Sequence, residues 1–224
     1  MISKLLSTAV KLYLRSQVER AEYLKVKIIG GNKQILTGYI PQIFLSCSHA
    51  VYRGLYLSQV ELRGADIAFN LPEVLKKQPL KLLEPVFVDL ELKLSAADLQ
   101  ASVDSPLLQS GIKDLWKMIL EARQGALTNT AIDWNNIAIA DGKLNLRGIY
   151  ENVAGKVQQL ILSTEVSLAD SHTLSLTPLK IDLKSSTVEI NNELKIDLGT
   201  DIAIEQLVVE SKQILCVGKI KINS

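Results

Sequence analysis

Residues 51–70, VYRGLYLSQVELRGADIAFN, constrain the fold more than any other stretch, because they are rich in strand-forming residues from end to end. A strand of this length exceeds the usual one. Its apolar residues change parity twice: the order is Leu55 and Leu57 on odd positions, Val60 and Leu62 on even ones, then Ala65 and Ile67 on odd ones. A β-bulge adds one residue to a strand and so reverses its alternation. The pattern therefore predicts a strand with a bulge at each switch, in a sheet that curves.

Alternating apolar residues indicate strands through most of the remaining chain. From Val86 to Leu94 every second residue is apolar, which gives that strand one continuous apolar face. The β-rich stretches are 24–68, 86–94 and 131–222, the last of which ends in a strand from Ile214 to Ile222 with Cys216 and Ile220 facing inward.

Two turn signals fix predicted hairpins in the second half of the chain. Asp141-Gly142 is a strong two-residue turn, and its register sets Ile139 opposite Leu144. At Asn191-Asn192, a three-residue loop would set Ile190 opposite Leu194. We therefore expect a hairpin at each place.

Helices are expected in three places. Residues 2–20 place apolar residues on one side and cations on the other, and residues 70–85 contain a short proline-bracketed turn. Ser95 to Asp98 is a helix-capping signal, and a second helix begins at Ser105-Pro106 and runs to about Arg123. The apolar stripe of that second helix consists of Leu108, Ile112, Leu115, Trp116 and Ile119.

Together these elements predict an α+β fold, with long curved antiparallel sheets wrapped around a central helix and an amphipathic helix at the N-terminus. We expect one elongated domain over residues 1–224. Its parts are the helix 1–20, the strands and helix pair 24–123, and the β-rich half 131–222.

The helix over residues 2–20 has two readings. It packs its apolar side on its own sheet, or it lies in a membrane interface, and exchange between the two positions is a third arrangement. In the membrane reading the docking residues are Lys4, Leu5, Lys11, Leu12 and Arg15. A protein partner could also bind through this helix.

Composition excludes some classes of function. The 25 basic and 24 acidic residues give a net charge of +1, which argues against a general nucleic-acid binder. Aromatic residues are only 5% of the chain, too few for a surface that stacks bases or sugars. The first residues lack the pattern of a signal peptide and no apolar run could span a bilayer, so we expect a cytoplasmic protein, peripheral at a membrane.

The sequence carries none of the common enzyme motifs. Cys47 and His49 would share a face of a strand and could form a nucleophilic pair, but structural roles suit both residues better. No metal site or cofactor is expected. Whether Cys47 pairs with Cys216 stays open at this point.

Residues 14–42 and 50–109 resemble the cyanobacterial branch of the LmeA-like phospholipid-binding family. The resemblance rests on the order of several short features rather than on one motif. These are the turn of Tyr52, Arg53, Gly54 and Leu55, followed by Asp98, Leu99, Ser102, Ser105, Pro106, Leu107 and Leu108.

The resemblance implies a fold similar to tubular lipid-binding (TULIP-like) domains, with a groove for acyl chains and no catalytic residues. We therefore expect a non-enzymatic phospholipid-binding or lipid-transfer protein that acts at a membrane surface. The alternative is a membrane-associated scaffold with a dry core that binds a partner protein. The expected lipid-lining residues are Leu45, Cys47, Leu55, Leu57, Val60, Leu62, Ile67, Val88, Leu90, Leu92, Ile112, Leu115, Trp116 and Ile119.

Overall fold

The computed structural model describes residues 2–122, 131–140, 142–151, 155–183, 186–190 and 192–223. Within these ranges strands predominate and every strand pairing is antiparallel, so the α+β class predicted from the sequence is confirmed. The strands form two sheets, which we call the first and the second sheet.

The first sheet combines the N-terminal strands with the last two strands of the chain. Its strands, in spatial order, are β1 (Arg20–Ile29), β2 (Tyr39–Tyr52), β3 (Leu55–Ala68), β4 (Val86–Ser95), β12 (Gln213–Ile222) and β11 (Ile202–Val209). The second sheet has the order β10 (Leu194–Asp197), β8 (Thr173–Leu183), β7 (Val157–Asp170), β6 (Lys143–Glu151) and β5 (Asp133–Ala140), with β9 (Ser186–Ile190) also paired to β8.

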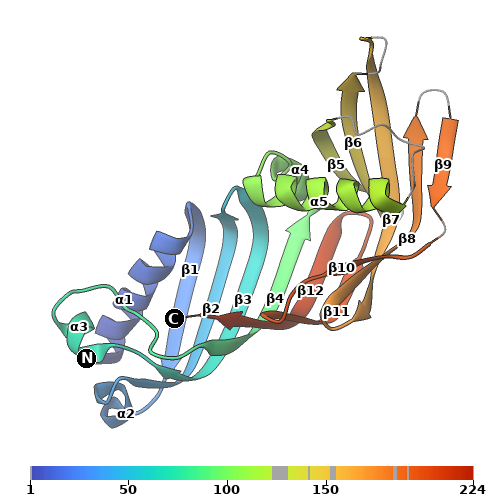
Figure 1. Ribbon diagram of the computed structural model, residues 1–224. Helices are drawn as coiled ribbons and strands as arrows, with labels where there is room; N and C mark the ends of the chain where they lie inside the picture. The colour runs from blue at the N-terminus through green and yellow to red at the C-terminus, as the bar shows by residue number, and fades with distance from the viewer. Residues whose placement is uncertain are drawn as a thin grey trace.

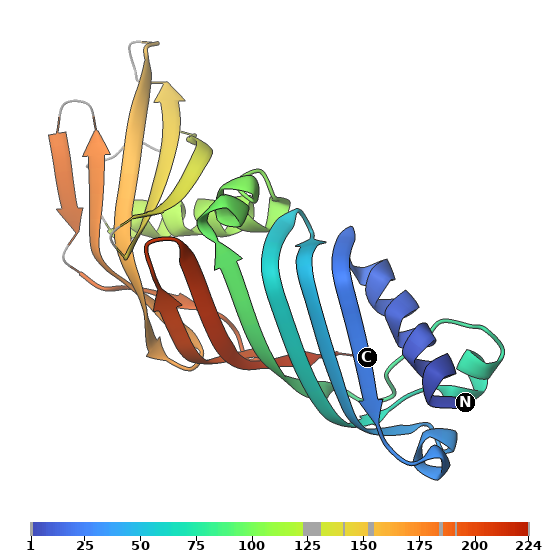
Figure 2. The ribbon, with the colours of Figure 1, turned by 180° about the vertical axis from the view of Figure 1, so that it is seen from behind.

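The helices lie at the ends of the first sheet and on the second. They are α1 (Ile2–Gln17), α2 (Asn32–Leu36), α3 (Leu71–Leu75), α4 (Ala96–Ala101) and α5 (Pro106–Ala122). Figures 1 and 2 show α1, α2 and α3 at one end of the molecule, the second sheet at the other, and α4 and α5 between them.

Strands β2 and β3 keep one register along their whole length, from Tyr39 opposite Ala68 to Tyr52 opposite Leu55. No residue is inserted, so the two bulges predicted for this hairpin are wrong. The irregularities are instead left-handed residues, His49 in β2 with φ 49° and Asp66 in β3 with φ 55°. A left-handed residue turns the backbone without changing which residues pair.

The predicted hairpin at Gly142 is confirmed, because Ile139 lies opposite Leu144 as the turn requires. The hairpin predicted at Asn192 is wrong. Ile190 pairs with Leu179 and Leu194 pairs with Leu176, so β9 and β10 both extend along β8 instead of pairing with each other. Strand β8 is long enough for both β9 and β10 to pair with it. A rule based on turn residues alone does not predict such pairing.

Helix α1 packs on the first sheet through Leu6 and Val10, which are 2% and 7% exposed. Leu12, which the sequence places on the apolar side, is instead 63% exposed. Leu14 packs inward beside Tyr13. The side chains of residues 2–5 lie outside the described part of the chain.

The buried side chains form two separate cores. One lies between α1, the loop that contains α3, and the end of the first sheet where β1 ends. The other joins α5 to the second sheet, and Trp116 meets Trp134 edge-on in it at 5.8 Å. The buried stripe of α5 thus faces the second sheet, whereas α1 covers part of the first. Arg123, the predicted end of the second helix, lies outside the described residues.

Candidate functional site

One face of the first sheet is apolar from edge to edge. Residues paired across neighbouring strands lie on the same face of a sheet, so the register defines rows of side chains. One row consists of Val26, Leu45, Leu62, Leu90, Gly218 and Ile204, and the next of Cys47, Val60, Leu92, Cys216 and Leu207. At the usual strand spacing, a row that crosses six strands is about 24 Å long.

The two ends of this apolar face are covered and its middle is not. At one end Ile28 and Ile43 pack into the core under α1, and at the other Val209 and Ile214 pack into the core of α5. Between them lie side chains that are only half-buried and belong to neither core: Leu45, Val60, Leu90, Leu92, Ile204, Leu207 and Cys216. We call these seven residues the open face.

A small cavity adjoins the open face where α1 covers the sheet. Its volume is about 90 Å³. It is lined by apolar side chains and Gly64: α1 contributes Tyr13, the sheet contributes Leu45 and Leu62, and the loop after α3 contributes Leu80 and Leu82. Typical ligand pockets measure 300–1,000 Å³. A ligand with long chains would therefore have to extend from this cavity along the open face.

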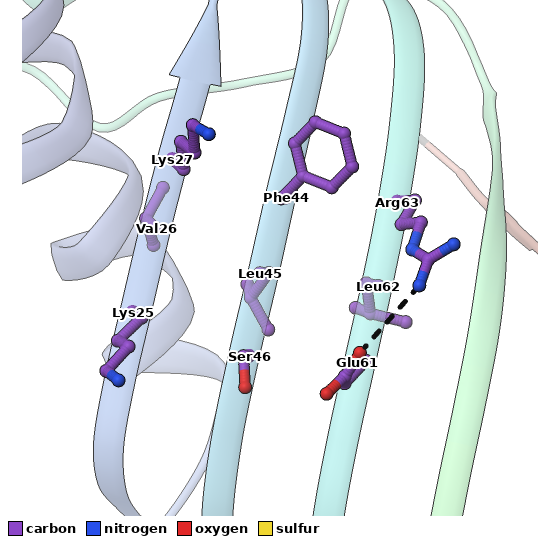
Figure 3. A pocket seen from close by; sticks show the side chains of 9 residues that line it. All are labelled: Lys25, Val26, Lys27, Phe44, Leu45, Ser46, Glu61, Leu62 and Arg63. Carbon is purple, nitrogen blue, oxygen red and sulfur yellow. Dashed lines mark ion pairs between the residues drawn. The ribbon is translucent and has the colours of Figure 1, made fainter.

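Over β1, β2 and β3, the opposite side of the first sheet is mostly polar. Lys27, Phe44 and Arg63 are paired across β1, β2 and β3, and alternation places them opposite the row that contains Leu45. Figure 3 shows the ring of Phe44 between the two cationic side chains, above an Arg63–Glu61 ion pair. A shallow depression of about 310 Å³ lies over these strands.

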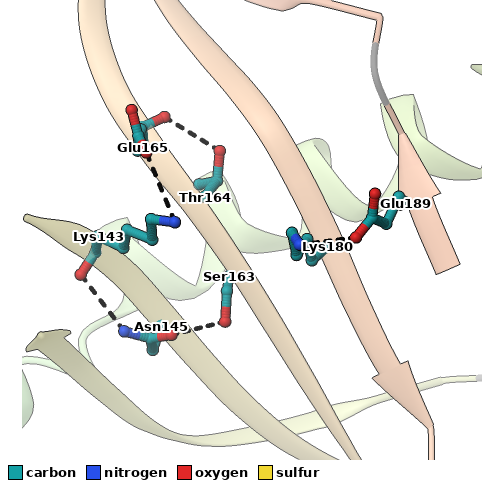
Figure 4. A network of polar contacts seen from close by, with 7 residues as sticks. All are labelled: Lys143, Asn145, Ser163, Thr164, Glu165, Lys180 and Glu189. Carbon is teal, nitrogen blue, oxygen red and sulfur yellow. Dashed lines mark hydrogen bonds and ion pairs between the residues drawn. The ribbon is translucent and has the colours of Figure 1, made fainter. Parts of the chain in front are cut away.

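The second sheet is divided between an apolar and a polar side in the same way. Its apolar side packs on α5. On the other side Ser163 donates a hydrogen bond to Asn145 at 2.6 Å, and Lys180 forms an ion pair with Glu189 at 2.6 Å (Figure 4). These two contacts pair four polar side chains of this side with one another.

The structure brings together eight of the fourteen residues expected to line a lipid site. They lie on the apolar face of the first sheet or in its cavity: Leu45, Cys47, Val60, Leu62, Ile67, Val88, Leu90 and Leu92. Four others, Ile112, Leu115, Trp116 and Ile119, are buried in the core of the second sheet. Leu55 and Leu57 lie at the far end of the β2–β3 hairpin, where α4 packs against β3.

Several residues of the apolar face were missed from the sequence. Val26 in β1 alternates with Leu24 and Ile28 in the sequence. Ile204 and Leu207 in β11 are three residues apart and reach the same face only through a register shift between Ile204 and Gln206. The contribution of Leu80 and Leu82 had no local signal, because their loop reaches the cavity only through the tertiary fold.

The two cysteines lie in one row of the apolar face. Cys47 is in β2 and Cys216 in β12, three strand spacings or about 14 Å apart, so they are too distant for a disulfide and both are free. Burial raises the pKa of both thiols. A raised pKa lowers the fraction of reactive thiolate.

The structure does not support Cys47 and His49 as a nucleophilic pair. His49 adopts a left-handed backbone conformation, its side chain is 63% exposed, and its Nδ1 lies 3.6 Å from a carboxylate oxygen of Glu22. Cys47 is buried on the apolar face. In the described ranges, no three His, Cys, Asp or Glu side chains gather in a way that could hold a metal ion.

Of the five residues expected to dock on a membrane, three have described side chains. Leu12 and Arg15 are exposed and Lys11 is half-buried. None of the helices in the described part of the chain is long and apolar enough to cross a membrane.

The fold thus leaves seven apolar side chains of the first sheet outside both cores, and exposed apolar patches commonly mark sites that bind an apolar ligand or a partner. The chain belongs to the LmeA-like phospholipid-binding family, whose sequence model matches residues 1–219 of the 224. The family predicted from the sequence is thereby confirmed, and it makes a lipid the expected ligand. No curated protein and no solved structure matches the chain.

Proposed function

We propose that this protein is a phospholipid carrier, and that the acyl chains of its ligand lie on the open face of the first sheet. The observation that carries the proposal is the open face, whose seven half-buried apolar side chains lie between the two cores and belong to neither. In a phospholipid-binding family, acyl chains are the natural cover for such a surface.

The chemistry of the open face suits acyl chains. Its side chains are aliphatic or thiol, without a buried charge or an unpaired polar group. Each methylene group that a lipid buries on such a surface stabilises the complex by about 0.8 kcal/mol. The headgroup has no polar partner on this face, so it would remain at the edge of the sheet or in solvent.

We also propose that the protein is not an enzyme and that it works at a membrane surface. The burial of Cys47, which raises the pKa of its thiol, and the contact of the exposed His49 with Glu22 argue against the nucleophilic pair that the sequence offered. The outward side of α1, with Lys11, Leu12 and Arg15, supports membrane contact. We treat residues 1–224 as one lipid-binding domain, because β11 and β12 return from the second sheet to complete the first.

The test is native mass spectrometry of the purified chain, followed by solvent extraction and lipid mass spectrometry. The proposal predicts one phospholipid bound per chain, either on purification or after incubation with anionic vesicles. A chain that stays empty after incubation would refute the proposal, and it would favour a scaffold that binds a protein partner through α1.

A further inference from the structure

The end of the molecule that holds α2 and α3 exposes apolar side chains in a repeated arrangement. Three times along the chain, a residue packed in the core or its cavity is followed directly by an exposed leucine. The pairs are Ile35 and Leu36, Val74 and Leu75, and Leu82 and Leu83. The exposed leucines are 51%, 55% and 60% accessible, in that order.

Backbone hydrogen bonds hold these segments together at one end. Phe69 donates to the carbonyl of Gly38 just after α2, and Leu83 donates to the carbonyl of Ala68. The side chain of Asn70 binds both the carbonyl of Pro79 and the amide of Lys81, which closes the loop that follows α3. Figures 1 and 2 show α2 and α3 at the same end from both sides.

Exposed lysines lie in the same segments as the three leucines. They are Lys33 in α2 and Lys76, Lys77 and Lys81 in the loop, against two acidic residues, Glu73 and Glu84, in the same segments. Within the described residues none of these four lysines forms an ion pair. Four cations and two anions give this end a net charge of +2, whereas the whole chain has +1.

We propose that this end, made of residues 32–37 and 70–85, docks on an anionic bilayer. Exposed leucines and exposed lysines in the same segments match the two layers of a membrane surface, since leucines can enter the acyl region while lysines contact anionic headgroups. The cores of protein–protein interfaces are depleted in lysine. This combination of leucines and lysines therefore suits an anionic bilayer better than a protein partner.

The docking end is continuous with the lipid cavity. Leu82 lines the cavity and Leu83, the next residue, faces solvent. A bilayer that receives Leu83 would therefore lie one residue away from the cavity wall. This inference rests on the proposed lipid-binding function, and it assigns the direction from which a phospholipid reaches the open face.

The test compares two variants for binding to vesicles of phosphatidylcholine with about 30 mol % phosphatidylglycerol, measured by co-sedimentation. The first variant carries Leu36→Ser, Leu75→Ser and Leu83→Ser. A leucine that inserts partway contributes about fivefold to the affinity, so the three losses together should weaken binding about 100-fold. The control carries Leu107→Ser and Val157→Ser, which remove exposed apolar residues from α5 and β7, elements that Figure 1 shows away from α2 and α3, and it should bind like the parent chain.

A second variant replaces Lys76, Lys77 and Lys81 by Gln. It should bind the same vesicles about 100-fold more weakly at low salt, at about fivefold per lysine, and the difference should shrink as salt is added. Parent-like vesicle binding by both variants would overturn the inference, as would a parent chain that does not bind anionic vesicles.

A soluble short-chain phospholipid separates this inference from the proposed function. Binding of this probe needs the open face but no bilayer. We expect both docking variants to bind it as the parent does. If the parent fails to bind the probe, the carrier function is wrong, while vesicle co-sedimentation still decides whether this end docks.

Discussion

Replacing Leu90 by glutamate places a charge in the middle of the open face and tests whether a lipid covers it. Leu90 lies between Leu62 and Gly218 in the longer apolar row, and it is half-buried in the protein without lipid. A glutamate at this position can be hydrated while the face is empty. A bound acyl chain would remove that water, and the carboxylate would have to take up a proton.

The cost of protonation sets the expected loss of affinity. With an ordinary glutamate pKa of about 4.3, neutralisation at pH 7 costs about 2.7 × 1.36, or roughly 3.7 kcal/mol, which is about a 500-fold loss. At pH 5 the same arithmetic gives about 1 kcal/mol and a fivefold loss. Since the pKa rises when lipid binds, affinity is kept below about pH 4.3 and lost as the pH increases.

The assay is titration of Leu90→Glu with a soluble short-chain phospholipid at pH 7 and pH 5. The matched control is Leu215→Glu, because Leu215 is a half-buried leucine on the opposite side of the same sheet, paired with Lys93. The control should bind at both pH values like the parent. Equal affinity of Leu90→Glu and the parent at pH 7, with the fold intact by circular dichroism, would refute the reasoning.

Three further predictions follow from the same structure. Alkylation of Cys47 and Cys216 by a maleimide should be slow at pH 7, because burial raises both thiol pKa values, and it should slow further when phospholipid is bound; mass spectrometry that finds equal rates with and without lipid would contradict the placement of the ligand. Ile119→Ala should lower the free energy of unfolding by about 2–5 kcal/mol, since Ile119 is fully buried in the core of the second sheet, yet leave lipid affinity unchanged; a matching loss of affinity would instead assign α5 to the site. Asn70→Ala removes two hydrogen bonds that close the loop after α3, so it should cost about 1–2 kcal/mol in a denaturant titration and speed proteolysis between residues 76 and 81; unchanged cleavage would show that the loop is held by its leucines alone.

Alternation and capping signals predicted most of the local structure. Strand β4, the cap at Ser95 and the turn before Lys143 all follow from side-chain chemistry within a few residues. The apolar face was predictable in the same way, because Leu62, Leu90 and Cys216 each stand in an alternating strand. Their alignment across β3, β4 and β12 depends on how these strands pair, and the sequence of one strand does not determine its register with another.

The wrong predictions for β3 and α5 have a common cause, because each depends on how segments distant in the sequence pack in the folded chain. The parity changes in β3 suggested inserted residues, but left-handed backbone at His49 and Asp66 accommodates irregularity without altering the register. The stripe of α5 looked suited to line a lipid channel, but the second sheet covers it with Trp134 and its neighbours. A helix pattern reveals that a face must be buried and does not reveal which of two sheets buries it.

Photo-crosslinking tests the central claim most directly. A phospholipid that carries a diazirine near the end of an acyl chain is bound, irradiated and mapped by peptide mass spectrometry. The account predicts adducts on the open face, at Leu45, Val60, Leu90 or Cys216, with none on the opposite side at Phe44 or Leu215. Adducts confined to that opposite side, or to α5 in the core of the second sheet, would contradict it.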